Sequence, residues 1–507
     1  MIRRGLILTG GTLHTLDREQ AVVRALMAFN GVVEYAGDDL DLQAMGVQDQ
    51  RSDWLRVLDL SGRAAIPGLV SVGRHLLHEA RELGTLDLSH VTKPSELFDT
   101  LRTSIEGQNP GAWIVARGLA PELAASFPGV RDHLDRLAPK NPLLLHGAQA
   151  EAEAVEAERW AVANSLALRA VVDDPERGLR EAGVVRREGV PSGRIEGRAL
   201  ERLRGVLPDP SERRREPLLE NALRRCVARG ITSVLDVGGC ETFALLARLH
   251  KSGGLPLRVS SSILPDELDA CRKAGVVAGF GDSFLRRGGM LLAFDSDASF
   301  ELPASARVDH RPTRLELARQ AANAGFPLWL FAPHADAVAE ALDLLEAVAV
   351  PRPAHLLFGV RSLAERERVR LERSGVHVSF AAVPCHGDEP VPATLASRGG
   401  RVGLSAPPDD RPALGALAAL LAHSRGQGGA FAEDYFELGE ALRANVVEGA
   451  RALGLDARLG TLGDGQKADL LILDRDPFLG GAMPRVVATF VAGEARYELP
   501  GWERRRA

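Results

Sequence analysis

Residues 64–80 read AAIPGLVSVGRHLLHEA, in which a largely apolar run, 64–72, ends at Gly73-Arg74-His75. A short apolar run bounded by glycine is typical of a strand that is buried on both faces. The two histidines that follow, His75 and His78, are three residues apart, and this spacing favours a solvated helix face over a metal-binding motif. The stretch therefore predicts a buried strand that ends in a polar turn.

Seven more runs of this kind follow, and most are separated by amphipathic stretches with helical spacing, such as RLELARQAANAG (314–325). The predicted strands lie at 231–237, 255–263, 289–295, 326–332, 354–360, 376–383 and 401–406. Together with 64–72, they make eight apolar strands that alternate with helices. This pattern predicts an α/β protein with a (β/α)₈ barrel.

Both ends of the chain instead contain short alternating strands with Asn-Gly or Gly-Gly turns, which are typical of antiparallel β structure. We expect residues 1–63 and 456–498 to form one small composite β-sandwich domain, with the barrel at 64–455 between its halves. The distance between the first two barrel strands predicts a long insertion at about 80–225. Within this insertion, the tract 148–168 (AQAEAEAVEAERWAVANSLAL) is expected to be helical with a solvated acidic face.

Composition narrows the classes of function. The 507 residues are 45% hydrophobic and 26% charged, with a formal net charge of −6, which suits a soluble protein with a large core. A mildly acidic chain lacks the excess of basic residues that is typical of proteins that bind nucleic acid or an anionic membrane. The sequence contains no apolar run of 18 residues, and the N-terminus has no signal-peptide core, so a cytoplasmic protein is expected. The four cysteines are too scattered for a disulfide framework or a CxxC zinc site.

Several longer stretches resemble one known family. They are LDLSGRAAIPGLV (58–70), PSGRIEGRAL (191–200), GITSVLDVG (230–238) and RALGLDARLGTLGDGQKADLLILDRDP (451–477). With them, the chain resembles the amidohydrolase superfamily, and within it the amidohydrolase 3 family of N-substituted amide and formamide hydrolases. The resemblance implies a distorted (β/α)₈ TIM-like barrel with a β-sandwich built from both chain termini.

The resemblance also implies a metal-dependent chemistry at the carboxyl-terminal mouth of the barrel. The first strand supplies a His-x-His pair, the fourth a carboxylated lysine or a carboxylate, and the fifth and sixth one histidine each, while an aspartate after the eighth strand is the general base. Such ligands hold a divalent ion and leave a position for water. The ion lowers the pKa of that water, so that it can attack an amide.

In this sequence the corresponding positions fall on Gly73, His75, Leu291, Phe331, Phe358 and Ala406. Only His75 carries a metal-binding side chain, and no lysine occurs between 274 and 466. Phenylalanine has no lone pair to offer and fills the space of an ion and its water. We therefore expect a degenerate site with no metal, no catalytic residues and no cofactor. If the mouth has been repacked, Phe331 and Phe358 should be largely buried and should touch one another or His75.

Other readings of these residues stay open. His75, Asp295 and His334 could line a ligand pocket at the mouth, and His75, His334, His355 and Asp295 could form a rebuilt zinc site. His355 is expected at the start of its strand, which is the wrong end for such a site. Cys385 and His386 are adjacent on the chain and make a poor nucleophile–base pair.

The expected function is that of a catalytically inactive amidohydrolase-family protein. It would bind a small molecule at the barrel mouth, form a homo-oligomer, or serve as a partner subunit of an active relative. The alternative is a metal-dependent hydrolase that acts on non-peptide carbon–nitrogen bonds through a rearranged ligand set, with zinc as its metal. A third possibility is a structural protein without a ligand.

Overall fold

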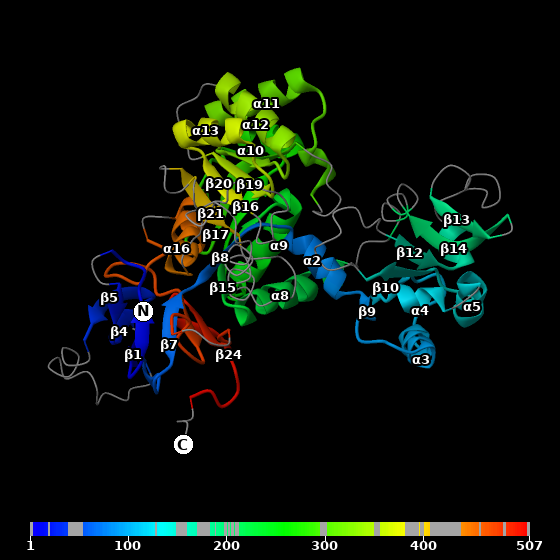
Figure 1. Ribbon diagram of the computed structural model, residues 1–507, viewed down its shortest axis with the longest axis horizontal. Helices are drawn as coiled ribbons and strands as arrows, with labels where there is room; N and C mark the ends of the chain where they lie inside the picture. The colour runs from blue at the N-terminus through cyan, green and yellow to red at the C-terminus, as the bar shows by residue number, and fades with distance from the viewer. Residues whose placement is uncertain are drawn as a thin grey trace. The chain divides into compact units, whose positions relative to one another are not determined.

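The computed structural model covers the 507-residue chain (Figure 1). It describes residues 4–18, 21–38, 54–126, 129–148, 160–169, 183–187, 189–196, 200, 203, 207, 212–294, 302–348, 355–380, 395, 400–405, 438–455, 458–479 and 483–503. The chain divides into two compact units. One combines residues 1–79 with 219–507, and the other is Ala80–Leu218.

The larger unit contains an eight-stranded sheet of parallel strands in the order β21-β20-β19-β18-β17-β16-β15-β8. The strands are β8 (Leu69–Arg74), β15 (Ile231–Asp236), β16 (Arg258–Ile263), β17 (Leu285–Ala293), β18 (Leu328–Phe331), β19 (Leu356–Val360), β20 (His377–Phe380) and β21 (Arg401–Leu404). Each lies within or overlaps one of the eight predicted runs. The predicted α/β fold with a TIM-like barrel is confirmed.

Helices follow most of these strands, as the alternating pattern predicted (Figure 1). The unit's helices are α9 (Gly239–Lys251), α10 (Leu268–Lys273), α11 (Arg311–Asn323), α12 (Ala335–Val348), α13 (Glu365–Ser374), α16 (Leu438–Arg443) and α17 (Gly449–Ala452), while the boundaries between the two units fall within α2 (Leu76–Leu83) and α8 (Glu212–Ala228). Three shorter or unusual segments are the 3₁₀ turns η2 (Pro265–Glu267) and η3 (Ala304–Ala306), and the π-helix η4 (Ala444–Glu448).

The first predicted barrel strand, 64–72, is two strands in the structure. Ala64–Pro67 forms β7, which pairs with β2 (Thr12–His14) and β22 (Leu470–Leu473) rather than with the barrel. The barrel strand β8 begins at Leu69. The residue before it, Gly68, donates its N–H to the Asp469 carbonyl. The sequence run is continuous because both strands are buried, so hydrophobicity alone could not reveal the break.

Strands from both ends of the chain share a sheet of order β24-β23-β22-β7-β2-β3, beside a four-stranded sheet of order β5-β4-β1-β6. The remaining strands are β1 (Gly5–Thr9), β3 (Val22–Val23), β4 (Ala25–Phe29), β5 (Val32–Gly37), β6 (Leu55–Asp59), β23 (Val486–Val491) and β24 (Glu494–Glu498). Asn30-Gly31 forms the turn between β4 and β5, as the sequence predicted. One buried apolar cluster, which includes Leu8, Leu26, Leu470 and Phe490, joins residues of the two sheets.

The smaller unit has a sheet of order β13-β14-β12-β11-β10-β9. Its strands and helices are β9 (Leu86–Asp87), α3 (Pro94–Ile105), β10 (Ile114–Leu119), α4 (Pro121–Ala125), α5 (Val130–Leu137), β11 (Leu143–Gly147), β12 (Trp160–Ala163), α6 (Ser165–Arg169), β13 (Val184–Arg187) and β14 (Val190–Glu196). The helical prediction for 148–168 is wrong at Trp160–Ala163, which form a strand, and residues 149–159 lie outside the described part. Pairing with β11 and β14 outweighs the helical preference of alanine there.

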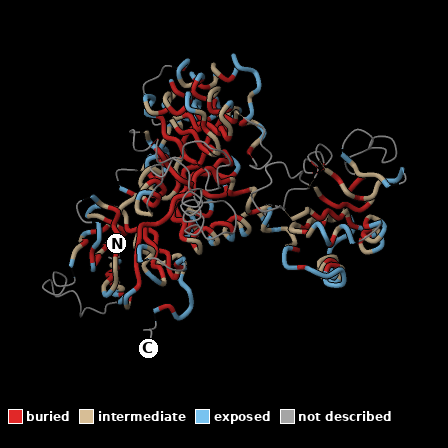
Figure 2. The backbone as a smooth tube through the Cα atoms, viewed as in Figure 1, coloured by how far each residue is buried: buried red, intermediate tan, exposed pale blue. Residues whose placement is uncertain are grey.

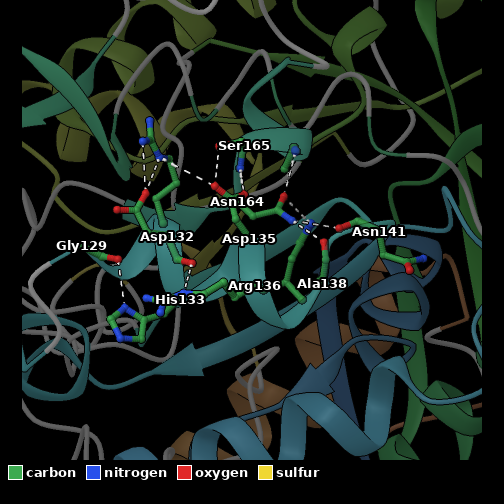
Figure 3. Close-up of polar contacts among 12 residues, drawn as sticks. Gly129, Asp132, His133, Asp135, Arg136, Ala138, Asn141, Asn164 and Ser165 are labelled. Atoms are coloured by element: carbon green, nitrogen blue, oxygen red, sulfur yellow. Dashed lines mark hydrogen bonds and ion pairs between the residues drawn. The ribbon is translucent and has the colours of Figure 1, made fainter.

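The buried Asn164 organises this unit between β12 and α6 (Figure 3). Its Oδ1 accepts the N–H groups of Leu143 and Ala167, both at 3.0 Å. Its Nδ2 donates to the carbonyls of Ala138 (3.2 Å) and Asn141 (2.9 Å). The side-chain amide therefore accepts two hydrogen bonds and donates two, its full capacity. These bonds fix the loop before β11 against the start of α6.

In the barrel strands most residues are buried, whereas exposed residues concentrate on helices and loops (Figure 2). Among the described residues, no helix has the length and apolar character needed to cross a membrane.

A buried ion pair joins the barrel to the strands contributed by the C-terminus. Arg258, the first residue of β16, donates from Nε and Nη2 to the two carboxylate oxygens of Asp469, at 2.7 and 2.9 Å. Asp469 also accepts the Ala492 N–H at 2.8 Å. Both charged side chains are at most 3% exposed, so each depends on the other for compensation of its charge.

We expect Asp469→Asn to lower the free energy of unfolding by about 3–5 kcal/mol, because it leaves the buried Arg258 charge without a counter-ion. The matched control is Asp269→Asn, which removes the exposed Arg272–Asp269 pair of α10 and should cost less than about 1 kcal/mol. Urea denaturation of both variants beside the wild type tests this. Equal, small effects in the two variants would contradict it.

A second buried carboxyl connects the end of β15 to the start of α2. Asp236 is fully buried, and its Oδ1 accepts the Leu76 N–H at 3.2 Å while its Oδ2 accepts the Ser261 hydroxyl at 3.0 Å. Burial raises the pKa of Asp236 to about 7, because desolvation outweighs these hydrogen bonds. The carboxyl is therefore largely protonated in the folded chain at mildly acidic pH.

This raised pKa predicts a pH dependence of stability. The folded state holds the Asp236 proton up to about pH 7, whereas the unfolded chain releases it near pH 4, so stability is highest at low pH and falls as the pH rises between these values. Relative to Asp236→Asn, the wild type should lose on the order of 4 kcal/mol across this window. Chemical denaturation from pH 4.5 to 8 measures the difference. A constant difference between the two proteins over that range would refute the prediction.

Candidate functional site at the barrel mouth

Four of the predicted ligand positions lie on barrel strands and a fifth directly follows one. Gly73 is the second-last residue of β8, and His75 comes directly after that strand. Leu291 lies in β17, Phe331 is the last residue of β18, and Phe358 lies in β19. In a parallel barrel the carboxyl ends of the strands meet at one face, where active sites are built. The sixth position, Ala406, lies outside the described residues, as do Asp295 and Asp409.

The backbone at Gly73 does not suit a metal-binding histidine. Its φ is +83°, in the left-handed region that favours glycine. The register between β8 and β15 also shifts at this point, because Leu235 pairs with Val72 and Asp236 with Arg74. A histidine at this position would be strained.

Phe331 and Phe358 pack against each other. They are register partners across β18 and β19, each is 1% exposed, and their ring centroids are 5.6 Å apart at an interplanar angle of 60°. A Cβ atom on Gly359 would lie 2.5 Å from the Phe331 ring, so the glycine makes room for this aromatic side chain. The pair belongs to one buried apolar cluster with Leu235, Leu291 and Trp329.

His75 is half-buried and lies just before α2, where its carbonyl accepts the Glu79 N–H. Its ring stacks on that of His78, with centroids 5.7 Å apart. The residue between the two mapped positions, Arg74, is buried and donates from Nε to Glu79 Oε1 at 3.0 Å. The polar groups here therefore include an arginine–glutamate pair that the sequence did not reveal.

The other two candidate histidines, His334 and His355, lie at opposite ends of the barrel strands. His334 is half-buried and precedes α12, after the carboxyl end of β18. His355 precedes β19, and its Nδ1 accepts the Leu328 N–H at 3.1 Å, so it lies at the amino-terminal ends of β18 and β19. Burial lowers the pKa of His355. Its expected position at the start of its strand is confirmed, and it does not meet His75 and His334 at the mouth.

The chemistry of the described residues does not fit a divalent ion. Among the residues in the ranges given above, no group of three or more histidine, cysteine, aspartate or glutamate side chains could hold a metal. Glycine, leucine and phenylalanine offer no donor atom to zinc, which needs at least three protein ligands in a hydrolytic site.

A polar cluster that the sequence reasoning missed lies elsewhere in the barrel. His377, Ser379 and Glu448 line a narrow cavity together with residues of β8, β19 and β21. The distance from His377 Nδ1 to Glu448 Oε2 is 3.4 Å. Desolvation alone would raise the pKa of Glu448, but His377, Arg451 and Arg401 outweigh it and hold the pKa below its ordinary value. The alternation in HVSF places His377 and Ser379 on one strand face and was the available signal.

Comparisons with known proteins agree with this architecture. The chain is 25% identical to the N-substituted formamide deformylase of Arthrobacter pascens over 98% of its own length and 99% of that protein. It is 23% identical to Protein LONG AFTER FAR-RED 3 of Arabidopsis thaliana, over 46% of the chain and only 38% of that protein.

Among solved structures, an uncharacterized metal-dependent hydrolase from Pyrococcus horikoshii OT3 superimposes with a TM-score of 0.72 at 20% identity, covering 94% of this chain and 98% of that one. A second, from Pyrococcus furiosus, has a TM-score of 0.71 at 21% identity, covering 93% and 99%. The sequence model of the amidohydrolase family matches residues 56–497. The chain therefore belongs to the amidohydrolase family.

Proposed function

We propose that this chain keeps the amidohydrolase fold but not the metal-dependent hydrolysis, and acts as a binding protein or as a partner subunit. The observation that carries the proposal is the packing of Phe331 against Phe358 at two of the mapped ligand positions. Two buried rings in contact leave neither a lone pair nor space for an ion and its water.

Further support comes from the other mapped positions. Gly73 has a backbone conformation that disfavours histidine, and Leu291 is fully buried in the same apolar cluster as the two rings. Replacing donor groups by apolar ones also removes the cost of desolvating them. Small-molecule binding near His75 and His334, oligomerisation, or pairing with an active relative are the roles that remain open to such a protein.

The packing of the mouth can be tested by truncation. Phe331→Ala and Phe358→Ala should each lower the free energy of unfolding by about 3–5 kcal/mol, the usual cost of removing a large buried aromatic side chain. Phe280→Ala is the control, because that ring is 53% exposed and its loss should change stability by less than about 0.5 kcal/mol. Thermal and urea melts give both values. Unchanged midpoints for both core variants would mean that the site is an empty, decayed cavity.

The absence of metal-dependent activity is tested directly. Protein purified without chelator should contain well under about 0.1 equivalent of zinc, iron or manganese by elemental analysis. Addition of zinc or manganese should neither raise the melting temperature nor produce hydrolysis of N-substituted formamides. A stoichiometric metal that a chelator removes together with activity would overturn the proposal.

One observation favours a second candidate function, that of a metal-dependent hydrolase of non-peptide carbon–nitrogen bonds. The chain matches a formamide deformylase over nearly its whole length, and the superimposed archaeal structures are described as metal-dependent hydrolases. A rearranged ligand set would have to use residues such as Asp295 or Asp409 besides His75 and His334. Asp295→Asn and Asp409→Asn should then each reduce the bound metal, whereas our proposal expects no change.

A further inference from the structure

The first and last strands of the eight-stranded sheet, β8 and β21, are its two ends and form no backbone ladder with each other in the described residues. Neighbouring strands elsewhere in the sheet are joined by regular parallel pairing. We call the junction between β8 and β21 the seam. Among the described residues, the side chains of Asn445 and Ser405 form hydrogen bonds across it.

The fully buried Asn445 spans the seam. Its Oδ1 accepts the Val70 N–H at 3.0 Å, and its Nδ2 donates to the carbonyls of Val70 (2.8 Å) and Leu404 (2.6 Å). The Ser405 hydroxyl donates to the Val72 carbonyl and accepts the Val72 N–H, both at 2.9 Å. Side chains thus supply hydrogen bonds at this junction, where no backbone ladder joins the two strands in the described residues.

Asn445 lies in η4, a π-helix, a rare geometry that is common at functional sites. Glu448 is the last residue of the same segment and faces His377 on β20. The π-helical turn therefore supplies both a seam side chain and one wall of the adjacent cavity.

The cavity beside the seam contains polar atoms that the closed form does not satisfy. Among the described residues, the buried Ser379 Oγ has no hydrogen-bond partner, and the buried His377 Nδ1 and Glu448 Oε2 face each other at 3.4 Å without good hydrogen-bond geometry. His377 Nε2 faces the donor Nη1 of Arg401 at 3.4 Å, which places the ring proton on Nδ1. The cavity therefore offers a donor, an acceptor and a hydroxyl, a set that suits water.

In the closed form this space is too narrow for a water molecule. Buried polar groups without partners carry a desolvation cost that hydration removes. Opening of the seam would break the hydrogen bonds of Asn445 and Ser405. It would also allow water to hydrate the polar groups of the cavity. Unsatisfied buried hydroxyls also occur on β16, at Ser260 and Ser262, but β16 is joined to both of its neighbours by backbone pairing, so the missing ladder is what distinguishes the seam.

We propose that the barrel opens locally at the seam between β8 and β21, and that this opening admits water to the cavity formed by His377, Ser379 and Glu448. The inference does not depend on whether the mouth binds metal. It makes the seam, rather than the packed mouth, a route by which solvent reaches the barrel core.

Hydrogen–deuterium exchange of the full chain, followed by mass spectrometry, tests the proposal. Peptides that cover 69–74 and 401–405 should exchange at least about tenfold faster than peptides that cover 289–293 and 328–331, a factor equivalent to about 1.4 kcal/mol. Low urea concentrations should leave the seam rates unchanged, because local opening exposes little surface. Equal rates in the seam and the central strands would overturn the proposal.

Two variants sharpen the test. Ser379→Val removes one unsatisfied hydroxyl and fills the cavity, so it should slow exchange at the seam about threefold or more relative to the central strands. Ser262→Val is the matched control, because Ser262 is also buried with an unsatisfied hydroxyl but lies on β16, and it should leave that ratio unchanged. If Ser379→Val slows both sets of peptides equally, the seam does not open on its own.

Asn445→Ala should have the opposite effect and raise the seam rates while the central strands keep theirs. If this variant does not fold, the ratio measured for Ser379→Val against Ser262→Val still decides the question. If it folds and its seam rates match the wild type, Asn445 does not hold the seam and the proposal fails.

Discussion

The buried pair of Arg258 and Asp469 is the contact on which the arrangement of the larger unit depends. Through its carboxylate and its backbone, Asp469 binds the start of a barrel strand, the turn before β24 and the glycine that separates β7 from β8. A single residue thus links the barrel to strands from both chain termini. A bidentate arginine–carboxylate pair suits this role, because its planar geometry fixes orientation as well as distance.

The same barrel shows an unusual distribution of polarity. At the strand positions where the family resemblance implies donor groups, Leu291, Phe331 and Phe358 form part of an apolar cluster. A buried polar group, formed by His377, Ser379 and Glu448, lies instead beside the seam. An apolar cluster gains stability from burial, whereas a buried polar group that is not fully hydrogen-bonded costs stability.

Family membership settles the architecture of this chain but not its chemistry. Folds host many functions, and function depends on the groups at a site rather than on the barrel that carries them. The relatives suggest hydrolysis of carbon–nitrogen bonds, while the described side chains at the mouth lack the donors for it. The two views make opposite statements about metal content, a property that one measurement can determine.

The sequence by itself determined the eight barrel strands, the β-rich ends and the Asn30-Gly31 turn, because periodicity and turn chemistry are local properties that each segment carries alone. It also predicted that Phe331 and Phe358 would be buried together and that His355 would lie at the start of its strand. Only the tertiary structure decided where the run 64–72 breaks, because both halves are equally apolar and differ only in their partners. It also revealed the strand at Trp160–Ala163, the neutralising burial of Asp236 and the seam. The seam joins Val70 to Asn445 and Val72 to Ser405, pairs that are 375 and 333 residues apart in the chain, and no local pattern contains contacts of that range.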